Sequence, residues 1–266
     1  MARDIIDDRF IGALHLRALT HQGLEHDPVH EHIAVQAGTI NSLMDGGYEG
    51  DTTLGEVMRL GNLGIGTIQQ LDGELIIIDG VPWVAAADGS VRQVSSSVKT
   101  PFAVVCHFSP SAPIDLEGPL DFTALTTTLD TIVADDASIA AIRIDGMFGD
   151  LKLRSVARQQ PPYPPLGEVV AHQSEWLVGT TAGSVIGFRF PDTTAGLEVP
   201  GYHLHFIADD RTSGGHILDL TVLSGRVSTD HCEELHVELP DGVNLGVPGV
   251  ADREGIKRAE GGSRDS

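Results

Sequence analysis

The chain has 266 residues and a mass of 28.2 kDa, and 17 basic against 38 acidic side chains give it a formal net charge of −21 at pH 7. With 41% hydrophobic residues and a mean hydropathy of +0.02, the composition excludes disordered, collagen-like and coiled-coil proteins. So negative a surface repels phosphate backbones and anionic lipids, and we therefore expect neither a nucleic-acid nor a membrane partner.

The chain begins MARDIIDDRF, in which Asp4, Asp7 and Asp8 interrupt the apolar run that a signal peptide requires. We therefore expect a cytoplasmic location. The two cysteines, Cys106 and Cys232, are expected to be free, buried thiols. Abundant aspartate with few lysines is typical of halophilic proteins, which predicts that the denaturation midpoint rises with KCl concentration.

Short segments with strand or helix patterns follow one another along the chain. In chain order, the patterns predict helices over 40–44 and 54–61, strands over 74–79 and 102–108, a helix over 121–134, a strand over 138–144, a helix over 169–176, and strands over 184–190, 202–208, 216–225 and 231–239. The predicted fold is α+β and sheet-rich: two β-sheet subdomains with short helices and a C-terminal tail near the active site.

A proline-rich stretch, QQPPYPPL over 159–166, is the strongest candidate domain boundary, because prolines neither join a sheet interior nor continue a helix. It divides the chain into an N-terminal α+β domain, 1–165, and a C-terminal β-rich metal-binding domain with a tail, 166–266. A short helix is expected over 252–260 within that tail.

The segment 201–216 contains the densest set of chemically active side chains. His203 and His205 stand two residues apart, so in a strand both imidazoles project from one face. A turn sequence, DDRTSGG, separates them from His216 at the start of the next strand. If His216 lies opposite Ile207, all three histidines share a face, whereas a slip of one residue would turn His216 away. Three imidazoles with an open fourth position suit a catalytic zinc or a related divalent ion.

Two other histidine-rich segments compete with this one. His26, His30 and His32 lie in an acidic stretch and are interpreted as part of a solvated loop or helix end. His231 and His236 are expected on opposite faces of one strand. The chain contains no Walker phosphate loop, no G-x-S-x-G elbow and no H-E-x-x-H helix, which argues against nucleotide enzymes, serine hydrolases of that class and zincin proteases.

Three blocks carry a resemblance to a known family. They are GIGTIQQLDGE at 64–74, PPYP at 161–164 and PGYHLHFIADDRTSGGH at 200–216, supported by GYEG at 47–50 and RSV at 154–156. In order and spacing they resemble α-acetolactate decarboxylase over about residues 40–240. The resemblance implies a metal-dependent lyase, usually with zinc, that converts 2-acetolactate to (R)-acetoin and carbon dioxide. It also implies a two-domain α+β fold and commonly a homodimer.

The resemblance also implies a set of site residues. The metal ligands fall on His203, His205 and His216, the acidic residue on Glu74 and the active-site arginine on Arg154. A glutamate from the tail is expected beside the metal, with Glu260 preferred over Glu254, and Thr67 is expected to bind substrate. From the residues alone, Arg154 could equally be an exposed strand residue, Glu74 a solvated edge charge and Glu260 a helix-end charge.

The chemistry of acetolactate suits such a site. Its ketone and tertiary hydroxyl can chelate one ion, and a Lewis acid stabilises the enediolate that remains after carbon dioxide leaves. Arg154 is expected to hold the carboxylate or help deliver a proton to one face, with Glu74 sharing that proton transfer. The cofactor is expected to be Zn²⁺ or another divalent ion. The rival hypotheses are a non-catalytic metal or small-ligand binding protein of the same fold, and a metal-dependent hydrolase.

Overall fold

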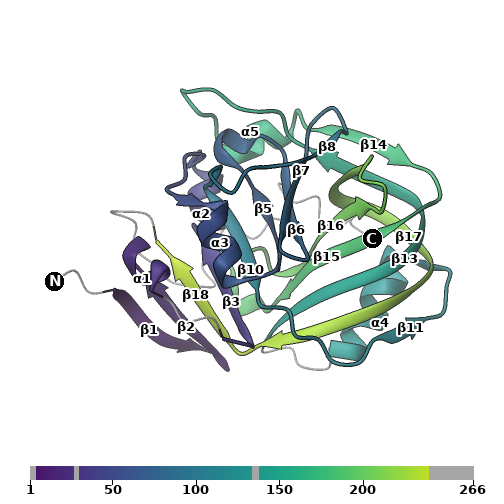
Figure 1. Cartoon of the computed structure of the whole chain (residues 1–266), viewed down its shortest axis with the longest axis horizontal. Helices are drawn as coiled ribbons and strands as arrows, with labels where there is room; N and C mark the ends of the chain where they lie inside the picture. The colour runs from purple at the N-terminus through teal and green to yellow at the C-terminus, as the bar shows by residue number, and fades with distance from the viewer. Residues whose placement is uncertain (1–3, 27–29, 134–137, 240–266) are drawn as a thin grey trace.

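The computed structural model describes residues 4–26, 30–133 and 138–239, and two large β-sheets dominate it (Figure 1). The first sheet has nine strands in the order β1 (Ile5–Ile11), β2 (Leu14–Leu19), β18 (Glu234–Glu238), β3 (Ile33–Ala37), β10 (Phe102–Cys106), β5 (Leu63–Thr67), β6 (Glu74–Ile78), β7 (Val81–Ala85) and β8 (Val91–Gln93). Its pairs are antiparallel except where β18 lies parallel between β2 and β3.

The second sheet has the order β11 (Ile114–Leu116), β17 (Gly214–Cys232), β16 (Gly201–Ala208), β15 (Thr181–Phe190), β13 (Ile139–Ser155) and β14 (Ser174–Val178). The short β12 (Leu120–Asp121) also pairs with β17. Because β17 pairs with β13 as well as β16, this sheet closes on itself. A separate two-stranded sheet joins β4 (Thr52–Thr53) to β9 (Lys99–Thr100).

Short helices flank these sheets (Figure 1). They are α1 (His21–Glu25), α2 (Ile40–Met44), α3 (Leu54–Leu60), α4 (Phe122–Val133) and α5 (Leu166–Val170), with 3₁₀ turns η1 (Gln69–Leu71) and η2 (Asp192–Thr194). The helix α3 begins at a capping box, in which Thr53 and Glu56 satisfy each other's backbone N–H groups. Among the described residues, no helix is both long enough and apolar enough to cross a membrane.

The strand β6 shows why the core lies where it does. Its residues are almost continuously apolar and all are buried. Leu75 and Ile77 pack with α3, whereas Ile76 and Ile78 pack on the opposite face with strands of the second sheet. Successive side chains of a strand point to opposite faces, so a strand covered on both sides needs apolar residues at nearly every position. The core between the sheets is therefore encoded by these uninterrupted runs.

The sheet-rich α+β prediction is confirmed, and most of the predicted elements are present. The segments at 40–44, 54–61, 74–79, 102–108, 121–134, 184–190 and 202–208 form α2, α3, β6, β10, α4, β15 and β16. Cys106 and Cys232 are free and buried, as predicted. The expected helix over 252–260 and the tail lie outside the described residues.

The helix predicted over 169–176 is wrong. The helix α5 ends at Val170, and the chain then forms β14, which pairs with the last five residues of β13. Backbone pairing with an existing strand overrides the weak helical periodicity of this segment.

The strands predicted over 138–144, 216–225 and 231–239 have the wrong lengths. β13 has 17 residues and β17 has 19, and β17 and β18 are separate strands on either side of Glu233. Glycines lie inside the first two strands and allow close approach between them, since a Cβ at Gly146 would lie 2.2 Å from the carbonyl oxygen of Ser224.

Residue 165 does not separate the strands of the first sheet from those of the second. β11, β12 and β13 already belong to the second sheet, and β18 returns to the first. The proline-rich stretch connects β13 to α5 and β14, so it lies within the connections of one sheet. β13 already ends at Ser155, before the first of these prolines at position 161, and the stretch marks no change of sheet. The division into domains 1–165 and 166–266 stays a prediction.

Candidate functional site

Three buried histidines meet in the second sheet. His203, His205 and His216 are 5%, 0% and 4% exposed, and one ring nitrogen from each lies within 4.8 Å of the others. The ring centroids are 5.1 to 5.4 Å apart. Burial of three imidazoles around one point is the arrangement that a zinc-type ion requires.

The strand register brings these histidines to one face. His205 lies directly opposite His216, and Ile207 lies opposite Gly214. The suggested pairing of His216 with Ile207 is therefore wrong by two residues. Side chains alternate with a period of two, however, so a shift of two keeps His216 on the same face as His203 and His205. Six residues separate Ile207 from its partner Gly214, two fewer than the eight that would separate Ile207 from His216 in the suggested pairing, so the shorter turn sets this register.

Arg154 joins the same row from the neighbouring strand. It lies on β13 directly opposite His216 on β17, so its side chain shares the face of the histidines. Arg154 is 3% exposed, which excludes its interpretation as an exposed strand residue. Its Nη1 donates a hydrogen bond to Oε1 of Gln173 at 3.1 Å.

Glu74 reaches the histidines from the first sheet. Its Oε2 is 3.6 Å from Nε2 of His205, and the residue is 9% exposed, so it is not a solvated edge charge. Nδ1 of His205 donates to the carbonyl oxygen of Leu75 at 2.9 Å, which leaves Nε2 as the nitrogen that faces the cluster. Residues 74 and 75 of β6 thus both contact His205 across the space between the sheets.

Thr67 lies directly opposite Glu74 on β5 and is buried. Its hydroxyl donates to the carbonyl oxygen of Gly73 at 2.8 Å. That bond holds the turn before Glu74 in place, so Thr67 positions the start of β6. The predicted role of Thr67 in binding substrate stays a prediction.

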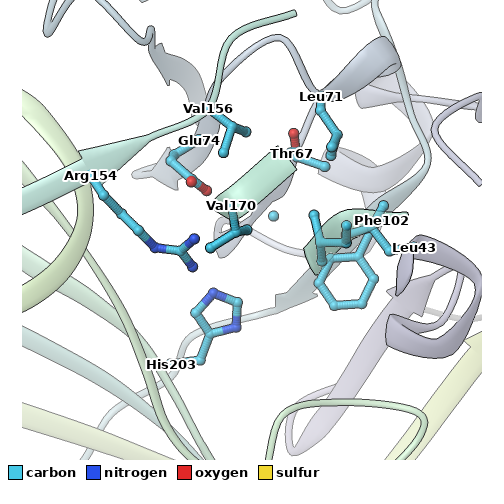
Figure 2. Close-up of a pocket in the computed structure, with 11 residues that line it drawn as sticks. Leu43, Thr67, Leu71, Glu74, Phe102, Arg154, Val156, Val170 and His203 are labelled. Carbon is cyan, nitrogen blue, oxygen red and sulfur yellow. The ribbon is translucent and has the colours of Figure 1, made fainter. Parts of the chain in front are cut away.

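A cavity opens beside these groups (Figure 2). Arg154, Glu74 and His203 lie on one side of it, and Leu43 and Phe102 lie on the other. The remaining wall is mostly apolar and is formed by Gly66, Thr67, Leu71, Val156, Leu166 and Val170. The cavity therefore pairs a charged face with an apolar one, as small-molecule sites do.

Burial, together with the nearby positive charge of Arg154, lowers the pKa of His203 to about 3. The unfolded chain binds a proton at this histidine below about pH 6.5, whereas the folded chain stays neutral there. We therefore expect that lowering the pH from about 6.5 to 3 destabilises the metal-free protein by up to about 1.4 kcal/mol per pH unit through this group. Denaturant unfolding between pH 5 and 7 measures the effect in the wild type and in His203→Gln. If the free energy of unfolding changed equally with pH in the two proteins, the expectation would be contradicted.

Gly187 on β15 permits the backbone approach beside His203. Its φ is +154°, and a Cβ there would lie 2.0 Å from the carbonyl oxygen of His203. Gly187→Ala is expected to destabilise the protein by about 3 kcal/mol, because it combines backbone strain with a steric clash. Gly179→Ala is the matched control, since nothing lies within 4 Å of the position that its added methyl group would take. Chemical denaturation of both variants tests this, and similar midpoints would refute it.

The other histidine-rich segments do not form a three-histidine group among the described residues. His32 lies 3.1 Å from a carboxylate oxygen of Asp230. His231 and His236 lie on different strands, β17 and β18, where they contact Ser138 and Glu234 respectively. The interpretation of 231–236 as one continuous strand is therefore wrong. Glu254 and Glu260 lie outside the described residues.

Sequence reasoning missed two features. Gln173 contacts Arg154 only because β14 pairs with β13, and this pairing has no local signal. A second group of potential metal ligands, His21, Glu25 and Glu56, combines residues from α1 and α3. The spacing of His21 and Glu25, four residues apart on a helix, was the one signal that pointed to it.

A family model described as alpha-acetolactate decarboxylase matches residues 35–245. The chain is 40% identical over 240 residues to a protein of that name from Methylococcus capsulatus, covering 89% of this chain and 91% of the relative. It is 39% identical over 214 residues to a protein of the same name from Brevibacillus brevis, covering 80% of this chain and 75% of that relative. The crystal structure of alpha-acetolactate decarboxylase from Bacillus subtilis strain 168 superposes with a TM-score of 0.81 at 32% identity, covering 86% of this chain and 99% of that one.

Proposed function

The chain belongs to the alpha-acetolactate decarboxylase family and is thus a carboxy-lyase, and we propose that it decarboxylates 2-acetolactate to (R)-acetoin at the cavity between the two sheets. One observation carries the proposal. Glu74 from the first sheet and Arg154 from the second converge on the same three buried histidines, although they are 80 residues apart in the sequence. A merely structural metal site would not need a buried arginine beside it.

We propose that His203, His205 and His216 hold the metal ion. The donor set fits a zinc-type ion: three imidazoles are buried together, and the hydrogen bond from His205 to Leu75 orients Nε2 toward the cluster. When bound, the ion supplies a Lewis acid for negative charge that develops on the oxygens of the substrate. Zinc is the proposed ion, and imidazole ligands also accept other divalent transition ions.

Arg154 is proposed to bind the carboxylate that leaves as carbon dioxide. A guanidinium offers two parallel N–H donors to a carboxylate, and the low polarity of a buried site strengthens their attraction. Because arginine keeps its proton at all ordinary pH values, it orients and stabilises charge rather than supplying the proton.

Glu74 is proposed to move the proton that the product requires. Its carboxylate projects into the cavity beside Arg154 (Figure 2). Leu43 and Phe102 form the opposite wall, and neither side chain carries a proton donor. A proton delivered from the charged side alone reaches one face of the intermediate, which accounts for a product of single handedness.

Other parts of the proposal rest on the family resemblance. They are the contribution of Glu260 to the site, a homodimeric assembly and substrate contact by Thr67. A cytoplasmic location and adaptation of the acidic surface to high salt are proposed from the sequence alone.

Gln173 is predicted to position Arg154. Its amide oxygen accepts from Arg154, and its Nε2 donates to Oε1 of Glu175 at 2.7 Å. Hydrogen bonds from Lys152 and Gln173 hold the pKa of Glu175 below its ordinary value, so this carboxylate stays ionised and fixes the orientation of the amide. Gln173→Ala is expected to lower kcat about 10-fold with little change in stability, because the guanidinium loses its alignment. Steady-state kinetics test this, with Gln160→Ala as an exposed control; an unchanged kcat would remove Gln173 from the mechanism.

The deciding experiment measures acetoin formed from racemic 2-acetolactate by purified protein, before and after chelator treatment, at low and high KCl. Loss of activity with the chelator and its recovery with Zn²⁺ would support both the reaction and the cofactor. Tight metal binding with intact acetolactate would favour a binding protein of the same fold. Release of an acid or alcohol from an ester, without acetoin, would favour a hydrolase.

A further inference from the structure

A second group of metal-ligating side chains lies apart from the three histidines. His21 and Glu25 occupy adjacent turns of α1, and Glu56 lies in the first turn of α3. One ligand atom from each lies within 4.8 Å of the others. The group therefore connects two helices that are far apart in the sequence.

The imidazole of His21 is already oriented for a ligand. Its Nδ1 lies 2.6 Å from Oε1 of Glu238, a carboxylate that is only 6% exposed and lies at the end of β18. Its Nε2 is turned toward Oε1 of Glu56, 3.9 Å away. A buried carboxylate that holds one ring nitrogen while the other faces outward is the support commonly found behind metal-binding histidines.

Glu56 is oriented by a separate set of bonds. Its Oε2 accepts from the backbone N–H and the hydroxyl of Thr53, each at 2.6 Å, and Oε1 is left on the side of His21. Two ligands of a tetrahedral ion are about 3.4 Å apart when each bond is about 2.1 Å long. The 3.9 Å between Nε2 and Oε1 closes to that value with a small movement. Glu25 is exposed, so its side chain can turn inward without repacking.

The charge around this point favours a cation. Glu25, Glu56 and Glu238 contribute three carboxylates, and His21 is the titratable base among them. We propose that His21, Glu25 and Glu56 bind one divalent transition-metal ion of the Zn²⁺ type, which links α1 to α3. One imidazole with two carboxylates suits such ions. The competing arrangement is a protonated His21 that pairs with Glu238 and Glu56 without any metal.

Calorimetric titration of the chelator-treated full-length protein with Zn²⁺ at pH 7.5 tests the proposal. The wild type is expected to bind two equivalents. Glu25→Gln and His21→Gln are each expected to weaken binding of the second equivalent of Zn²⁺ at least 10-fold. His26→Ala, a change at an exposed neighbouring histidine, is expected to leave that binding unchanged. Glu25→Gln removes only an exposed charge, so its result does not depend on the fold tolerating a change at His21.

Other results of this titration would overturn the proposal. One is binding of a single equivalent of Zn²⁺ by the wild type that His205→Ala abolishes. The other is a second equivalent that Glu25→Gln and His21→Gln leave unchanged. His205→Ala separates the two sites, because the equivalent at α1 and α3 is expected to persist in it. Loss of acetoin formation in that variant would leave this inference untouched.

Discussion

His205→Ala is expected to lower kcat for acetoin formation by at least about 10³-fold and to remove one equivalent of bound metal. His205 is the central member of the group: it is fully buried, it pairs with His216 across the hairpin, and its Nε2 faces Glu74. Its loss would open the coordination sphere and would also remove the partner of the Leu75 carbonyl oxygen. Acetoin assay and elemental analysis measure the two effects.

The matched control for this variant is His107→Ala, which removes an exposed imidazole. It should keep wild-type activity and metal content. Circular dichroism and a thermal melt of both variants separate a lost site from a lost fold. If folded His205→Ala kept more than a tenth of the wild-type activity, the three-histidine site would not be the catalytic centre.

Arg154→Lys is expected to lower kcat/KM by about 10² to 10³-fold, although it preserves the charge. A lysine ammonium cannot form the two parallel hydrogen bonds of a guanidinium, and its different shape breaks the contact with Gln173. Arg143→Lys is a control on the same strand, because Arg143 forms ion pairs with Asp79 and Asp145 away from the histidines. That variant should differ from the wild type by less than 2-fold.

The kinetic pattern of Arg154→Lys distinguishes between two roles of the guanidinium. A raised KM with constant kcat would indicate carboxylate binding in the ground state, and a lowered kcat would indicate stabilisation of the reaction itself. A reduced enantiomeric excess of the acetoin would indicate that Arg154 also controls the face that is protonated. Wild-type values for all three quantities would exclude Arg154 from the site.

Much of the site was predictable from local pattern. The two-residue spacing of His203 and His205 in an apolar strand places both on one face whatever the strand pairs with. The apolar run at 75–78 predicted a strand, and the structure accounts for its continuity, because a strand buried on both faces needs apolar residues at nearly every position. The family blocks identified Glu74 and Arg154 through resemblance, since neither residue has a local signal.

The tertiary structure decided which groups meet. Sequence determines the alternation of side chains along β16 and β17, but the pairing of His205 with His216 depends on how the turn at 209–213 closes. Arg154 and Gln173 depend on pairing between β13, β17 and β14, and Glu74 on the packing of one sheet against the other. Residues close in sequence set local conformation through sterics and burial. Register and sheet packing arise from contacts between residues far apart in the chain, which no local pattern contains.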